Sequence, residues 1–131
     1  MNRCGWGRQL TGLVLVLLLG GCSSTPDANS PVGMEYSGGT LVSVEAATFQ
    51  QVWRAASAAL DDADVTILDR QRIENGGKLD GRTPDLQAVR VTVRVLTENK
   101  TELRIRIDSL GNSELARRIY ARFKIALGPT P

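Results

Sequence analysis

Cys22 is the residue whose type and surroundings point most directly to a chemical event. The chain opens with a basic stretch that carries Arg3 and Arg8, and a run of ten largely apolar residues over 10–19 follows. Two glycines then lead into the cysteine. A basic segment, an apolar segment and small residues at a cleavage site make up an export signal. The apolar run is about half of the roughly 20 residues that span a bilayer, so residues 1–21 are predicted to be a cleaved signal peptide.

The sequence Leu19-Gly20-Gly21-Cys22 resembles the lipobox of bacterial lipoproteins. The resemblance implies cleavage before Cys22 and acylation of that residue, which would anchor the protein in the lipid bilayer. Ser23 follows, whereas lipoproteins with an aspartate there tend to stay in the inner membrane. The resemblance therefore implies the outer membrane, on its periplasmic side. The alternative is an ordinary signal peptide followed by a cysteine without a special role.

Four arginines form a second candidate group. Arg90 and Arg94 alternate with valines in one predicted strand, and Arg104 and Arg106 alternate with apolar residues in the next. Side chains alternate between the two faces of a strand, so all four share the polar face of one antiparallel hairpin. The connection must then contain an odd number of residues. Three residues would place Arg94 opposite Arg104, and five would place Arg90 opposite Arg106.

Either register puts two like charges directly opposite each other, which is mildly destabilising unless carboxylates intervene. Asp80, Glu102 and Asp108 are the candidates for that role. Two interpretations of the arginines stay open. They form a solvated sheet face whose side-chain stems shield the apolar pleat, or they form a guanidinium platform for phosphate, carboxylate or an acidic protein surface.

Composition excludes several catalytic chemistries. The chain has no histidine, which removes imidazole general bases and histidine-ligated metals. Cys4 leaves with the signal and Cys22 serves the anchor, so no thiol remains for a disulfide or a zinc site. Sequence fingerprints of serine hydrolases, phosphate loops and dinucleotide-binding folds do not occur. We therefore expect a protein that is not an enzyme and binds neither cofactor nor metal.

Net charge gives no reason to expect a nucleic-acid partner. Removal of Arg3 and Arg8 with the signal reduces the sixteen basic residues to fourteen, which equals the number of acidic residues. Aromatic residues do not interleave the arginines, as they do on surfaces that bind single-stranded nucleic acid. Nucleic acid is therefore not expected among the partners.

The chain divides into three segments. Residues 1–21 are the signal, and residues 22–39 comprise the lipidated cysteine and a flexible linker rich in serine, proline and glycine. Residues 40–128 form a single domain. It begins with a short strand over 40–45, and Thr48 with Gln51 then gives the capping-box pattern that starts a helix. Trp53 lies in the apolar stripe of that helix and is expected to anchor the core.

The remaining pattern predicts strands at 65–70 and 78–82, the arginine hairpin at 89–95 and 103–107, and a last helix capped by Asn112 or Ser113. The element order is β-α-β-β-β-β-α. We expect an α+β two-layer sandwich, in which an antiparallel sheet of four or five strands carries both helices on one face.

From Gly39 to Leu127 the chain resembles a family of small bacterial lipoproteins known as domain of unknown function 3568. The resemblance lies in FQQVWRAA at 49–56, GKLDGR at 77–82, the alternating hairpin, and GNSELARRI at 111–119. It implies the fold and the compartment, and no catalytic residue. The helix-grip domains of lipoprotein subunits in outer-membrane assembly machinery are a looser likeness, used only as an analogy.

These observations predict a membrane-anchored periplasmic lipoprotein that acts as an interaction or accessory module for another cell-envelope component, such as a protein partner. The alternative is a module that binds a small molecule, a lipid or an anionic ligand. For a small molecule or lipid, that alternative requires a deep apolar concavity between sheet and helices.

Overall fold

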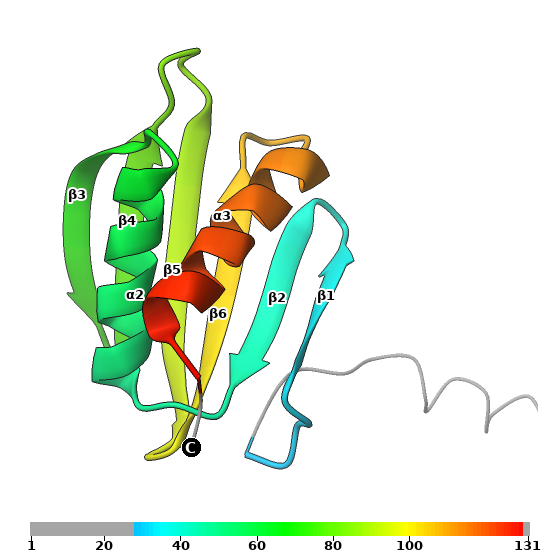
Figure 1. Cartoon of the computed structure of the whole chain (residues 1–131), viewed down its shortest axis with the longest axis vertical. Coiled ribbons are helices and arrows are strands. Elements are labelled where there is room, and N and C mark those ends of the chain that lie inside the picture. The colour runs from blue at the N-terminus through cyan, green and yellow to red at the C-terminus, as the bar shows by residue number, and fades with distance from the viewer. Residues whose placement is uncertain (1–27, 130–131) are drawn as a thin grey trace, which may run out of the picture.

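The computed structural model describes residues 28–129, which form six strands and two helices. In chain order these are β1 (Gly33–Ser37), β2 (Thr40–Glu45), α2 (Phe49–Asp62), β3 (Thr66–Ile73), β4 (Gly76–Arg82), β5 (Ala88–Thr97), β6 (Lys100–Ile107) and α3 (Ser113–Leu127). The strands form one antiparallel sheet in the order β1-β2-β6-β5-β4-β3. Both helices cover the same face of this sheet (Figure 1). The predicted α+β two-layer architecture is therefore confirmed.

The sheet has one strand more than the upper end of the expected four to five. The added strand, β1, lies inside residues 22–39, the range expected to be a flexible linker, so ordered structure begins earlier than that boundary. Gly38 and Gly39 form the two-residue turn into β2, with φ values of 60° and 83°. Left-handed backbone at both positions is what a tight hairpin requires and what glycine adopts at little cost.

Both helices begin at the predicted caps. The Gln51 amide donates to Thr48 Oγ1 over 3.3 Å, and the Thr48 amide donates to Gln51 Oε1 over 2.9 Å, which completes the capping box of α2. The Leu115 amide donates to Asn112 Oδ1 over 3.1 Å, so Asn112 caps α3. These bonds satisfy amides that have no partner within the first helical turn.

The core fills the space between the sheet and the helices. The odd-numbered residues from Val89 to Val93 in β5 and from Thr101 to Ile107 in β6 face the helices and are buried, whereas the even-numbered residues between them face away. The buried apolar side chains of the sheet form one cluster with those of α2 and α3. Across β5 and β6 the register is that of a five-residue connection, since Arg90 lies opposite Arg106. A bulge after Val95 then lets the strands continue to a two-residue turn at Glu98–Asn99.

Trp53 is half-buried and packs against the core cluster instead of lying wholly inside it. Its ring stacks on Phe49 with 5.5 Å between centroids and covers the backbone of Gly77 in β4. A Cβ atom on Gly77 would lie 2.4 Å from the Trp53 ring, closer than two carbons can approach. The glycine therefore lets α2 approach the sheet.

We expect Gly77→Ala to lower the free energy of unfolding by about 1–3 kcal/mol, because the new methyl group overlaps the Trp53 ring. In a Trp53→Leu background the smaller side chain leaves space, so the same glycine substitution should cost clearly less. Denaturant unfolding of the wild type, the two single variants and the double variant measures this coupling. If Gly77→Ala lowered the free energy of unfolding equally in both backgrounds, the contact between residue 77 and the Trp53 ring would be contradicted.

Candidate functional site

The four predicted arginines lie together on the sheet face that the helices leave uncovered, here called the open face. The alternation of β4, β5 and β6 places seven basic and two acidic side chains on this face. They are Lys78, Arg82, Arg90, Arg94, Lys100, Arg104 and Arg106, with Asp80 and Glu102. These three strands carry an excess of five positive charges, and Glu35 of β1 and Asp69 of β3, which the register places on the same face, reduce the excess over the whole sheet to three.

Glu102 is a buried carboxylate on the open face, with its side chain 1% exposed. Arg94 Nε and Arg104 Nε donate to Glu102 Oε1 over 3.3 and 3.0 Å, and an Nη2 group of each arginine reaches Oε2 at 3.5 and 3.4 Å. Glu102 also pairs across the sheet with Val44 of β2, which is itself buried. The two guanidinium groups thus neutralise a carboxylate that has little contact with water, which gives both arginines a structural role.

Arg90 and Arg106 are direct neighbours across β5 and β6, as a five-residue connection predicts. Each is turned toward its own acceptors. Arg90 Nε donates to Asp80 Oδ1 over 2.7 Å. Arg106 donates to the Gly38 carbonyl and to Thr40 Oγ1, both over 2.9 Å, and also to the Ser109 carbonyl. These acceptors offset the repulsion between the paired arginines.

Of the three candidate carboxylates, Glu102 lies between two arginines, whereas Asp80 pairs with Arg90 alone. Asp108 has another role, since its Oδ1 accepts the Ala88 amide over 2.8 Å and joins the end of β6 to the start of β5. Arg90 is the most available of the four arginines, because its side chain is 59% exposed. Within residues 28–129 its one ion pair is with Asp80.

A hollow of about 460 Å³ opens beside Arg90. It lies where the bulge of β3, the end of β4, the start of β5 and the end of β6 meet. Its lining consists of Leu68, Asp80, Gly81, Arg82, Ala88, Val89, Arg90, Arg106, Asp108 and Ser109. The lining combines guanidinium groups with exposed apolar surface.

A second polar cluster, which the sequence analysis missed, ties β2 to α3. Glu45 faces α3 with its side chain 1% exposed, and it accepts from Lys124 Nζ and Tyr120 Oη, both over 2.7 Å, and from Ser43 Oγ. Burial raises the pKa of Tyr120 to about 12, so its hydroxyl stays protonated and can donate to Glu45 near neutral pH. Lys124 of α3 is therefore the charge partner of a buried carboxylate.

A sequence signal for this cluster exists. Leu41, Ser43 and Glu45 form one alternating row, and Tyr120 and Lys124 are four residues apart on α3. Alternation places Ser43 and Glu45 on the same sheet face as the core residue Leu41. The four-residue spacing places Tyr120 and Lys124 on one face of α3, so the two polar groups can meet.

Cys22 lies outside the described residues, so its acylation stays a prediction. Within residues 28–129, no group of three or more histidine, cysteine, aspartate or glutamate side chains is arranged to hold a metal ion. Over the same range, the structure contains no helix that is long and apolar enough to cross a membrane.

We expect replacement of both Arg94 and Arg104 by alanine to lower the free energy of unfolding by more than about 2 kcal/mol, because a buried carboxylate that loses its partners costs about 3–5 kcal/mol. Adding Glu102→Gln should recover most of the loss, since the amide carries no charge. Arg90→Ala is the control, and its exposed pair with Asp80 is worth about 1 kcal/mol at most. Denaturant unfolding would contradict this account if Glu102→Gln failed to restore the double variant.

Comparison with known protein families matches residues 8–125 to a family described as a protein of unknown function, DUF3568. The match begins before the apolar run and therefore includes Cys22 as well as the folded domain. No curated protein matches the chain. Because the match covers most of the 131 residues, the chain belongs to the DUF3568 family.

Proposed function

We propose that this protein is a lipid-anchored protein of the bacterial outer membrane, whose domain binds another component of the cell envelope on the periplasmic side without catalysing a reaction. The observation that carries the proposal is the apolar run ending in Leu19-Gly20-Gly21-Cys22. The family match supports it, because the matched range spans this segment together with the domain. Anchor and domain then act as one unit.

The packing of the domain favours binding through its surface. A small-molecule or lipid carrier needs a deep apolar cavity between sheet and helices. In this domain the space is filled by core side chains that are each at most 2% exposed, namely Ala59 and Leu60 of α2, Phe123 of α3, and Val89, Val91 and Val93 of β5. The hollow beside Arg90 opens instead on the other face of the sheet, among charged side chains. These features support an interaction module over a carrier.

The start of the domain supports an anchor at one end of the sheet. Lys100 Nζ donates to the carbonyls of Ala28 and Ser30 over 3.1 and 2.8 Å, which holds the first described residues beside the β5–β6 turn. Six residue steps separate Ala28 from Cys22, a stretch of at most about 20 Å when fully extended. In the proposal, this end of the sheet lies next to the bilayer and the opposite end points into the periplasm.

Replacement of Cys22 by serine tests the anchor. We expect Cys22→Ser to abolish incorporation of a fatty-acid probe and to leave an unlipidated, uncleaved precursor, because the thiol that accepts the diacylglycerol is gone. Metabolic labelling, gel mobility and membrane fractionation measure the outcome. Cys4→Ser is the matched control and should label like the wild type. A Cys22→Ser variant that still labels and fractionates with the outer membrane would overturn the anchor.

A further inference from the structure

We propose that the hollow beside Arg90 is a docking site for a segment of a partner protein that carries a carboxylate flanked by apolar side chains. The inference rests on the proposed function, and it assigns the surface and the chemistry of the partner. It depends on the charge of the hollow, the apolar residues around it, the strain of one loop and the position of the site in the fold.

Charge favours an acidic occupant. Arg82, Arg90 and Arg106 line the hollow against Asp80 and Asp108, which leaves one positive charge in excess within a face that is itself basic. The two carboxylates already accept hydrogen bonds, Asp80 from Arg90 and Asp108 from the Ala88 amide. Arg90 uses its Nε for Asp80, and its fork-shaped guanidinium group suits a second carboxylate.

Apolar exposure favours a protein segment over a phosphate or a glycan. Leu68, at the bulge of β3, lines the hollow and is 63% exposed. Leu86 and Leu110 lie in the two loops that flank it and are 72% and 92% exposed. Large apolar side chains gathered around a charged hollow are typical of protein interaction sites. A sugar or phosphate ligand would gain little from three leucines.

Backbone strain supports a contact role for Leu86. This leucine has a φ of 67°, a left-handed conformation that is unfavourable for a bulky residue and that glycine or asparagine adopts more readily. Two hydrogen bonds hold its loop. The Leu86 amide donates to the Thr83 carbonyl over 2.9 Å, and Arg82 donates to the Leu86 carbonyl over 3.2 Å. Strained residues held in this way occur at ligand clamps. The loop therefore presents the exposed Leu86 side chain to a partner in a fixed backbone conformation.

The site also lies at the end of the sheet remote from the first described residues. Figure 1 shows the β4–β5 and β6–α3 connections at one end, and the start of β1 at the other. In an anchored protein the hollow would face away from the bilayer, where a periplasmic partner can reach it.

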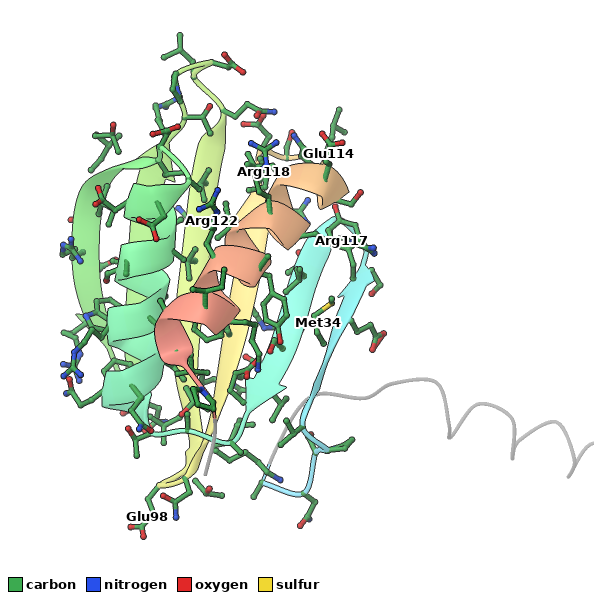
Figure 2. The ribbon with its side chains drawn as sticks, viewed as in Figure 1. Met34, Glu98, Glu114, Arg117, Arg118 and Arg122 are labelled. Carbon is green, nitrogen blue, oxygen red and sulfur yellow. The ribbon has the colours of Figure 1, made fainter. Side chains whose placement is uncertain are left out.

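Site-specific photo-crosslinking of the full chain in its own cells tests the proposal. The photoreactive residue p-benzoylphenylalanine replaces Leu86, Leu110 or Glu98 one at a time, and mass spectrometry maps the crosslinked peptide. Glu98 is the position control because it lies at the opposite end of the sheet (Figure 2). We expect Leu86 and Leu110 to crosslink one segment of one protein, with an aspartate or glutamate beside apolar residues, and Glu98 not to reach it.

Two substitutions separate docking from folding. Arg90→Gln should reduce the crosslink from position 110 at least fivefold, whereas Arg118→Gln, a matched change on the helix-covered face (Figure 2), should leave it within twofold. Leu86→Asn should also reduce that crosslink while leaving the melting temperature equal or higher, because asparagine relieves the left-handed strain. Loss of the crosslink together with a lower melting temperature would count against the contact role.

The proposal is overturned by crosslinks to lipid, to glycan, to a second copy of this chain or to a segment without a carboxylate. Equal yields with and without Arg90, or no crosslink from either leucine position in an acylated chain, overturn it as well. If the acylated chain instead binds a partner through α3, this docking site is wrong and the proposed function stands. Failure of acylation at Cys22 would remove the proposed function itself.

Discussion

The antiparallel register of β5 on β6 is the constraint on which the rest of the structure depends. It places Val89, Val91 and Val93 beside Ile107, Ile105 and Leu103 on one face, and the helices pack on that row. The same register places Arg90 opposite Arg106 and Arg94 opposite Glu102 on the other face. A slip of one residue would turn the apolar row to solvent and the arginines toward the core. Core packing and the chemistry of the open face therefore follow from one pairing.

Two buried carboxylates stabilise the sheet from opposite faces. Glu102 joins β5 to β6 through Arg94 and Arg104 on the open face, and Glu45 joins β2 to α3 through Tyr120 and Lys124 on the helix side. Buried charge is costly without partners, so these clusters favour one arrangement of the strands and of α3 over others. Arg94 and Arg104, which pair with Glu102, therefore have a structural role. Arg90, whose partner is half-buried and whose own side chain is largely exposed, stays available at the hollow.

Most elements of the fold could be predicted from regular patterns in the sequence. The capping box at Thr48, the Asn112 cap and the strict alternation of the arginine hairpin predict α2, α3, β5 and β6, because each depends on residues close in sequence. β1 was missed because glycine and serine around Met34 and Tyr36 give it the composition of a linker, although the Gly38–Gly39 turn marks a hairpin. The burial of Glu102 depends on Val44 and two arginines brought together by strand pairing, and the hollow depends on two loops. Such features follow from tertiary contacts, which local patterns do not encode.

The central claim is that the domain is polarised, with its anchored end at the β5–β6 turn and its binding end at the opposite loops. Depth-dependent fluorescence quenching on the acylated protein in lipid vesicles tests it most directly. The chain has two cysteines, and the predicted processing removes Cys4 and acylates Cys22, so a cysteine introduced at Glu98 or Leu110 is the one reactive thiol for a fluorophore. A strand of eight residues such as β6 is about 26 Å long. The account predicts strong quenching of the label at position 98 by a headgroup-attached quencher and weak quenching at position 110. Equal quenching, or the reverse order, would contradict it.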